Sequence, residues 1–415
     1  VAIEHTTDLK DNVLSSPSLG VNETVQGENK FDYFSAKIDQ HWSSKFISSL
    51  RTNLGLVNIG RQAGGLTGGV SFPSAANSQD RNSLLIANKN MILGEHFTFE
   101  SNIQYSSFRW NYGKAVNPAS PDVTVLDPSS QTIAFLGNPG YVFDSHENTF
   151  QLQEKLNLYK GNHTIKFGTE LLSSDHLLFG GGNPNGSYTV QLTQSELDEV
   201  IAKQLGSKLD VQDIPSTAKV LSYGVELRPT SFGKRQNIFS FYAEDQFAAS
   251  AKLNLTIGVR YDYDNLSAGG NSHGDYNNIA PRFSFNYKLS DRSALRGGYG
   301  IFYDKILYTI YSDALQQNNT GTDFKKQLQY FVDQGIVPAG TNIDRVTFNG
   351  NLTVGESNSA GLPFGYLNGP PASTYDNQRN LFSNERRILN PNGYQNPYTQ
   401  QISLGYQYQI KSNQL

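Results

Sequence analysis

Runs of alternating apolar and polar residues recur along the whole chain, and they come in pairs. Alternation with a period of two residues is the pattern of a β-strand whose two faces lie in different environments. The sequence therefore predicts an all-β fold built from consecutive hairpins. The paired runs are 31–42 with 46–59, 83–92 with 97–109, 149–159 with 163–175, 238–247 with 253–265, and 281–289 with 293–304, followed by a last strand at 398–410.

The connections between these strands alternate in length. Within each pair the turn is only about three to five residues long, as in tight hairpins. Between pairs the chain runs on for roughly 14 to 90 residues, a contrast typical of barrels with short turns at one membrane surface and long loops at the other. We therefore predict a transmembrane antiparallel β-barrel, of which this chain holds about twelve strands. The long loops are expected at 60–82, 110–148, 176–237, 266–280 and 305–397.

The composition agrees with a barrel that surrounds a wet interior. Hydrophobic residues make up 37% of the 415 residues and the mean hydropathy is -0.47. In a barrel only the outward side chains must be apolar, so such a low value is expected. No run of residues approaches the roughly 18 apolar residues of a transmembrane helix, whereas a barrel strand needs only about 9–11 residues. Strands are therefore the expected membrane-crossing elements.

The sequence offers no sign of catalysis, of a cofactor or of a metal site. The seven histidines are scattered, and the chain has no cysteine. Glycine-rich runs such as 64–69 and 297–300 lack the lysine and the strand-to-helix context of a phosphate loop. The formal net charge of -4 gives no basic surface for nucleic acid. We expect a protein without catalytic residues, without a cofactor and without a nucleic-acid partner.

The polar faces of the strands supply candidate ligand-binding residues. The alternation Arg260-x-Asp262-x-Asp264 predicts a charged row that faces the lumen. Two arginines on the next two strands, Arg282 and Arg296, are expected to face the lumen as well. Aromatic residues of the loops and strand ends are further candidates for ligand contacts. They are Tyr141, Phe179, Tyr366 and Tyr375.

Short helices are expected inside two of the long loops. Thr193-Gln194-Ser195-Glu196 has the form of a capping box, and the apolar stripe that follows predicts a helix that ends at Gly206. A second helix is expected from Asp323 to Gly335. Aromatic residues near the strand ends suit the girdles at the two membrane surfaces. They are Phe31, Trp42, Trp110, Tyr263, Tyr303 and Tyr398.

Several segments give the chain a resemblance to a known family. Most of 151–410 is similar to the barrel of the TonB-dependent receptors of the Oar-like group, in the order and spacing of its segments. Each segment alone is little more than a strand pattern, and together they are specific. The residues that carry the resemblance are Asn162–Gly168, Phe241–Phe247, Leu253–Asp262, Asn278–Phe283, Leu295–Asp304 and Asn396–Gln401.

The resemblance implies a bacterial outer-membrane receptor with a 22-stranded barrel, an N-terminal plug and a segment that contacts TonB. We expect residues 1–415 to be part of one β-barrel domain, without the plug, the N-terminal extension and the C-terminal strands. The expected partners are outer-membrane lipid, an unknown ligand, and the TonB complex through the N-terminal region. The expected activity is uptake, or export, of a ligand across the outer membrane.

Two other functions fit the sequence. One is a structural or adhesive outer-membrane barrel whose loops bind neighbouring proteins without active transport. The other is a soluble binding protein with several sheets. The complete gene separates the first from a transporter, since a plug with a TonB-contacting segment favours the receptor. The second predicts that the protein stays in solution without detergent.

Overall fold

The structure is a computed structural model. It describes residues 1–61, 69–138, 141–182, 186–226, 231–316, 351–354 and 389–410, and single positions between 326 and 343.

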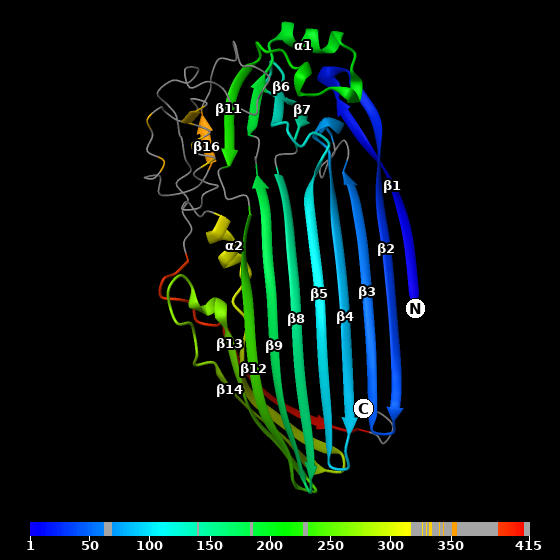
Figure 1. Ribbon diagram of the computed structural model, residues 1–415, viewed down its shortest axis with the longest axis vertical. Helices are drawn as coiled ribbons and strands as arrows, with labels where there is room; N and C mark the ends of the chain where they lie inside the picture. The colour runs from blue at the N-terminus through cyan, green and yellow to red at the C-terminus, as the bar shows by residue number, and fades with distance from the viewer. Residues whose placement is uncertain are drawn as a thin grey trace.

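Twelve antiparallel strands form one large sheet, in which each strand pairs with the next one of the series. The tight turns lie at one end of the sheet and the long connections at the other, as Figure 1 shows. No helix in the described part of the chain is long and apolar enough to span a membrane. The strands are β1 (Ala2–Ser16), β2 (Val21–Ser43), β3 (Phe46–Arg61), β4 (Asn77–Leu93), β5 (Phe97–Ala115), β8 (Tyr141–Lys160), β9 (His163–Gly182), β12 (Ser231–Ser250), β13 (Leu253–Asp264), β14 (Ile279–Ser290), β15 (Ser293–Tyr303) and β17 (Tyr398–Tyr408).

The five hairpins and the final strand predicted from the sequence are confirmed. Several strands extend further toward the loop end than the alternation indicated. Strands β8 and β9 each have 20 residues, or roughly 65 Å at about 3.3 Å per residue. Even when tilted, such a strand is longer than the roughly 30 Å of a bilayer core. The sheet therefore projects well beyond the hydrocarbon on the side of the long loops.

The first hairpin breaks the predicted alternation of short and long connections. Strands β1 and β2 are joined at the loop end by a single short turn, the 3-10 helix Pro17–Leu19 followed by Gly20 at φ 67. The sequence pattern did not mark β1 as the partner of another strand. The outward side chains of β1 include His5 and Asp11 between apolar ones, which weakens the alternation.

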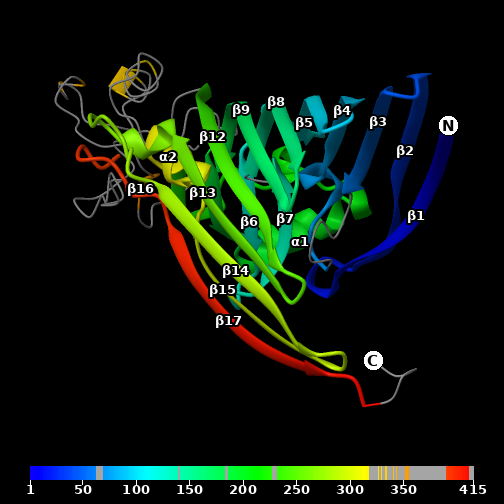
Figure 2. The same cartoon turned by 90° about the horizontal axis from the view of Figure 1, so that it is seen from below.

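The two faces of the sheet differ in polarity as predicted. On β13, Ile257 and Val259 are 59% and 44% exposed, whereas on the neighbouring β12 the polar Ser240 and Gln236 are 1% and 2% exposed. Figure 2 shows that the sheet bends into an open trough. Apolar side chains that stay exposed on a folded chain require an apolar surrounding. The outer face is thus built to contact hydrocarbon, and the polar face lines the inside of the trough.

Ion pairs mark where the apolar band of the outer face ends. Arg109 on β5 binds Asp144 on β8 at 2.6 Å, and Arg235 on β12 binds Asp175 on β9 at 3.2 Å. Of the six predicted girdle residues, Phe31 and Trp110 lie on the inner face, where Trp110 donates to Gln79 (2.7 Å). The other four lie on the outer face: Trp42, Tyr263, Tyr303 and Tyr398.

One polar row crosses the apolar band on the outer face. Glu154 of β8 lies in register between Ser101 of β5 and Thr169 of β9, and Ser101 donates to its Oε1 at 2.8 Å. The row continues to Asn90 and Ser48 on the next two strands. Because hydrocarbon offers no hydrogen bonds, these groups must find partners among themselves. The apolar alternation of β8 is therefore interrupted at one position.

Glycine on the inner face makes room for an aromatic ring. Gly168 of β9 lies opposite Tyr242 of β12, and a Cβ atom at Gly168 would come within 2.2 Å of the Tyr242 ring. The tyrosine ring thus lies flat across the neighbouring strand instead of standing in the lumen. Such a pair fixes the position of a large side chain on the wall.

We expect Gly168→Ala to destabilise the full-length protein by about 1–3 kcal/mol, because the Tyr242 ring must leave its place. Urea unfolding in lipid vesicles measures the change. Gly27→Ala is the matched control on a strand paired on both sides, because the nearest atom to its would-be Cβ is the flexible side-chain amide of Asn12 at 3.2 Å. Equal effects of the two substitutions would contradict this packing.

The long loops fold into a second sheet that lies over the loop end of the trough, and we call this region the cap. Its five strands are ordered β16-β11-β10-β6-β7. Figures 1 and 2 show the cap and its helix across the end of the trough. The sequence did not predict this sheet. Its strands are β6 (Asp122–Leu126), β7 (Thr132–Gly137), β10 (Ser187–Gln191), β11 (Lys219–Glu226) and β16 (Asn351–Val354).

The cap contains the main dry core in the described part of the chain. Its buried side chains come from the β1–β2 turn, from the cap strands and from helix α1 (Gln194–Ala202). The predicted capping box of Thr193 and Glu196 is confirmed. The helix ends at Ala202, earlier than the predicted Gly206, which begins a 3-10 turn. The second predicted helix, 323–335, lies outside the described residues apart from single positions.

The cap also holds a carboxyl group with a shifted pKa. Burial raises the pKa of Asp122 to about 6, and a hydrogen bond from Ser187 Oγ at 2.9 Å opposes the shift. A carboxyl with a higher pKa in the folded than in the unfolded state stabilises the fold most at low pH. That contribution is lost as the pH rises from about 4 through about 6.

We therefore expect Asp122→Asn to stabilise the cap by on the order of 2–3 kcal/mol at about pH 8, and to have little effect at about pH 3.5, below both pKa values. The ratio of protease cleavage rates between wild type and variant at each pH measures this difference. Asp198→Asn, at an exposed position of α1, is the control. A ratio for Asp122→Asn that does not change with pH would refute the expectation.

Candidate functional site

The polar groups of the inner wall are arranged in rows that run across the strands. Gln153 of β8, Glu170 of β9, Ser240 of β12 and Asp262 of β13 are register partners in turn. Side chains opposite each other on one face of an antiparallel pair lie about 4.5–5.5 Å apart. Strand pairing alone therefore brings these residues, distant in the sequence, into one connected group.

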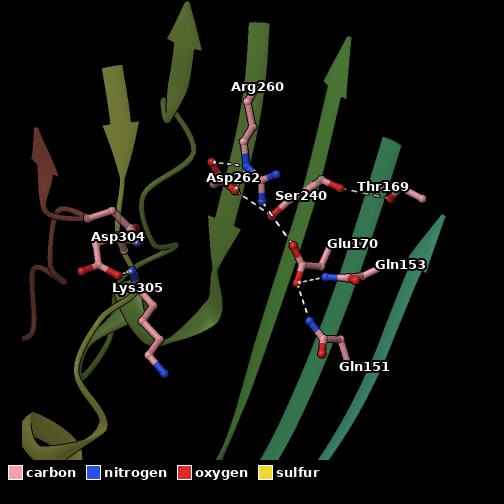
Figure 3. A network of polar contacts seen from close by, with 10 residues as sticks. Gln151, Gln153, Thr169, Glu170, Ser240, Arg260, Asp262, Asp304 and Lys305 are labelled. Atoms are coloured by element: carbon pink, nitrogen blue, oxygen red, sulfur yellow. Dashed lines mark hydrogen bonds and ion pairs between the residues drawn. The ribbon is translucent and has the colours of Figure 1, made fainter. Parts of the chain in front are cut away.

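Arg260 of β13 is the centre of this group, which we call the Arg260 network. Its Nε donates to both oxygens of Asp262 at 2.8 and 3.1 Å, and its Nη2 lies 3.5 Å from Glu170 Oε2. Figure 3 shows Arg260 pointing toward both carboxylates. The side chain of Arg260 is only 23% exposed. The predicted inward orientation of the Arg260–Asp262 row is thus confirmed.

Neutral side chains complete the hydrogen bonds of the two carboxylates. Ser240 Oγ donates to Asp262 Oδ1 at 2.6 Å. The amides of Gln151 and Gln153 donate to Glu170 Oε1 at 2.6 and 3.0 Å, as drawn in Figure 3. A half-buried group of charged side chains with this many hydrogen-bond partners keeps a fixed geometry. The network therefore presents a rigid polar wall to whatever occupies the trough.

A second charged group lies beside the first. Lys166 of β9 binds Glu244 of β12 at 2.9 Å, and Gln246 donates to the same carboxylate oxygen at 3.1 Å. Tyr242, which lies across Gly168, separates Glu244 from Ser240 along β12. The inner wall thus alternates between ion pairs and a flat aromatic surface.

Arg282 and Arg296 also face the trough, in different surroundings. The Arg282 guanidinium lies over the ring of Phe302, 4.5 Å from its centroid, and its Nε is buried without a hydrogen-bond partner. Arg296 donates to Gln407 of the neighbouring β17. Neither arginine forms an ion pair with a carboxylate in the described part of the chain. These two residues therefore add positive charge to the wall.

The aromatic candidates are not gathered near these arginines. Phe179 lies on the outer face of β9 and is 48% exposed. Tyr141 is the first residue of β8, at the loop end of the sheet. Tyr366 and Tyr375 lie outside the described residues. In the described structure, the inner wall therefore holds the three arginine candidates, but Arg296 lies at the level of Asn254, nearer the tight turns than Arg260.

Asp264, the last member of the predicted charged row, forms hydrogen bonds that hold the neighbouring loops in place instead. Its carboxylate accepts hydrogen bonds from Gln236 Nε2, from the backbone of Leu266 and from the backbone of Ile306. These bonds fix the chain that leads to helix α2 (Tyr308–Gln316), which the sequence did not predict. Tyr311 of α2 donates to the carbonyl oxygen of Leu266 at 2.6 Å.

Helix α2 also meets the inner wall at His176. The rings of His176 and Tyr308 stack with their centroids 3.9 Å apart. Burial lowers the pKa of His176, although the nearby Glu147 opposes the shift. The neutral ring is therefore the form that packs against the helix. This contact lies toward the loop end of β9, next to Asp175 of the Arg235–Asp175 ion pair.

The sequence missed Glu170, Gln151, Gln153 and Ser240 as members of the site. They are ordinary polar positions of their strands, and only the pairing register makes them neighbours of Arg260. The two-residue turn at Gly161-Asn162 sets the β8–β9 register directly. The β12–β13 hairpin has a register shift between Ala248 and Ser250, which turn length alone does not reveal.

In the described residues, no three His, Cys, Asp or Glu side chains are grouped closely enough to hold a metal ion. The arrangement offers hydrogen bonds and fixed charges to a bound molecule.

We expect strong coupling between Arg260 and Asp262. In a double-mutant cycle of Arg260→Gln and Asp262→Asn, the coupling should be about 1–3 kcal/mol, because either change alone leaves a half-buried charge without its partner. Urea unfolding in lipid vesicles gives the energies. The exposed pair Lys288–Asp291, 2.6 Å apart, is the control, and its coupling should be much weaker because solvent screens both charges. Coupling no larger than in the control pair would show that the network is not preorganised.

Comparisons with solved structures find outer-membrane receptors. The ferric yersiniabactin uptake receptor FyuA of Yersinia pestis matches at 9% identity over 73% of this chain and 42% of its own, with a TM-score of 0.41. The ferric enterobactin receptor PfeA of Pseudomonas aeruginosa matches at 13% identity over 76% and 41%, with a TM-score of 0.40. The ferric citrate transporter FecA matches at 10% identity over 75% and 41%, with a TM-score of 0.39. This chain spans about two fifths of the length of these receptors.

A search of curated proteins finds no match. A family described as "Outer membrane beta barrel domain" matches residues 10–273 and 265–415. These two matches cover nearly the whole sequence, and the exposed apolar band with its polar inner wall agrees with them. The chain therefore belongs to the outer membrane beta barrel domain family, and its place is the bacterial outer membrane.

Proposed function

We propose that this chain forms part of the barrel wall of a TonB-dependent transporter of the Oar-like group, which moves a ligand across the outer membrane. Uptake is the expected direction. The transported molecule passes along the inner wall, and no covalent chemistry takes place.

The observation that carries this proposal is the Arg260 network. Arg260, Asp262 and Glu170 place charge roughly 23–30 Å along their strands from the tight turns, on the opposite face from the hydrocarbon-facing side chains. Charges at that depth need water or a polar molecule on their open side. A wall of this kind suits the lining of a passage for a polar solute better than it suits a packed protein interior.

The two sheet edges support a larger barrel. Within the residues that the structure describes, strands β1 and β17 each pair with one neighbour only. Unpaired backbone groups cannot face hydrocarbon without a large cost in free energy. We propose that further strands of a longer protein pair with both edges, that residues 1–415 are one part of its barrel domain, and that a plug and a TonB-contacting segment belong to the same protein.

One observation favours the alternative function. The cap has its own dry core and a folded sheet above the membrane, which suits a surface barrel whose loops bind neighbouring proteins. A static barrel of that kind has no need for an energised passage. Energy dependence therefore separates the two functions.

Cysteine accessibility tests the proposal, because the 415 residues contain no cysteine. Ser284 and Phe283 are neighbours on β14 whose side chains lie on the inner and outer face respectively. In intact cells, Ser284→Cys of the full-length protein should react with a charged, membrane-impermeant thiol reagent. The reaction should slow at least several-fold when an uncoupler removes the proton gradient, because an energised plug movement opens the passage.

Phe283→Cys is the matched control and should react only with a lipid-soluble reagent. Equal rates at Ser284→Cys with and without the proton gradient would contradict active transport and favour the static barrel. A charged reagent that modifies Phe283→Cys in preference to Ser284→Cys would contradict the assignment of the two faces.

A further inference from the structure

A separate cavity of about 310 Å³ opens on the inner wall over β2, β3, β4, β5 and β8. It lies beside the Arg260 network and shares Gln151 and Gln153 with it. Nothing in the sequence pattern marked this part of the wall.

Strand register explains why a cavity forms here. One row across the strands holds Lys37, Arg51, Ala87, Gln104 and Gln151. The next row runs from Asp39 through Ser49, Lys89, Asn102 and Gln153 to Glu170, and only its four middle members line the cavity. Ala87 is the one small apolar residue in its row, and long side chains stand on both sides of it. The missing bulk at Ala87 leaves a hollow with polar walls.

The charges around the hollow do not balance. Lys37 binds Asp39 at 2.9 Å and Lys89 binds Glu100 at 2.9 Å. Both carboxylates lie outside the set of residues that line the cavity, whereas the three cations Lys37, Arg51 and Lys89 belong to it. No ion pair or hydrogen bond of the Arg51 side chain occurs within the described residues. The cavity thus has an excess of positive charge at Arg51.

Apart from Ser49, the remaining polar lining consists of residues with side-chain amides. Asn102, Gln104, Gln151 and Gln153 each offer a carbonyl oxygen, and the amides of Asn102 and Gln104 also have donors to spare. Amides act as both donors and acceptors, as the hydroxyl groups of a sugar require. Cations next to amides, without a lining carboxylate, favour a ligand that has both an anionic group and hydroxyls.

We propose that this cavity binds a small hydroxylated anion, such as a sugar phosphate or a sugar acid, with its anionic group at Arg51 and its hydroxyls at the amides. The inference rests on the proposed transport function in one respect, namely that the cavity lies on the route of the transported molecule. Binding itself needs neither TonB nor an energy source.

Calorimetric titration of the purified full-length protein tests the proposal with three probes: glucose 6-phosphate, glucuronate and uncharged glucose. Both anions should bind at least about tenfold more tightly than glucose, and added salt should weaken their binding. A preference for one anion identifies the phosphate or the carboxylate as the natural group. Either preference supports the proposal.

Three variants locate the binding site. Arg51→Gln should weaken binding of both anions about tenfold and leave glucose unchanged. Ala87→Met should abolish binding of all three probes by filling the hollow. Arg109→Gln, on the outer face, should change nothing. Circular dichroism confirms folding, and Arg51→Gln keeps the test valid if Ala87→Met fails to fold.

The proposal is overturned if neither anion binds saturably to the wild type, if glucose binds equally well, or if Arg109→Gln and Arg51→Gln have the same effect. If the anions bind but cysteine labelling does not depend on energy, the cavity is a binding site and active transport is rejected. If labelling depends on energy but neither anion binds, active transport stands and the binding site is rejected.

Discussion

The continuous ladder of backbone hydrogen bonds is the constraint on which the rest of the structure depends. In hydrocarbon every peptide group needs a partner within the protein, so each strand must pair along its whole length. Pairing fixes the register, and because side chains alternate between the faces, the register determines which residues meet on each face. The Arg260 network, the Gly168–Tyr242 pair and the hollow over Ala87 all follow from that single alignment of strands.

The same ladder separates two kinds of charge on the sheet. Charges on the inner face, such as Lys166 and Glu244, are paired across strands within reach of water. Charges on the outer face gather at the two borders of the apolar band, as at Arg109 and Asp144 toward the loops and at His163 and Asp245 toward the tight turns. Glu154 departs from this division, since it lies within the band and has one hydrogen bond, from Ser101. A lone carboxyl among apolar side chains is costly, which distinguishes this stretch of the outer face from the rest.

Strands and turns were predictable because alternation and tight turns are local properties of the sequence. The inward orientation of Arg260 and Arg282 followed from that alternation. At Phe179 the predicted strand ends too early. The sequence pattern places Phe179 outside the strand, whereas β9 runs on to Gly182 and the alternation from Leu171 puts Phe179 on the outer face. The cap was missed because strands such as β6 and β10 have five residues each, too few for a period to stand out. Bulges beside the turns, as between Ala248 and Ser250, shift the register in a way that turn length does not encode.

The dry core of the cap has a consequence for how the protein assembles. Its side chains come from the tip of the first hairpin, from Phe72 and from two later loops, among them Leu19, Val125 and Val200. These segments are far apart in sequence. The closure of such long loops is unfavourable until other contacts hold their ends, so we expect the cap to form after strands β1–β5, β8, β9 and β12 have paired. Formation of the cap therefore completes the assembly of this half of the sheet. A chain with one hairpin out of register would leave these apolar side chains exposed above the membrane, where quality-control proteases could reach them.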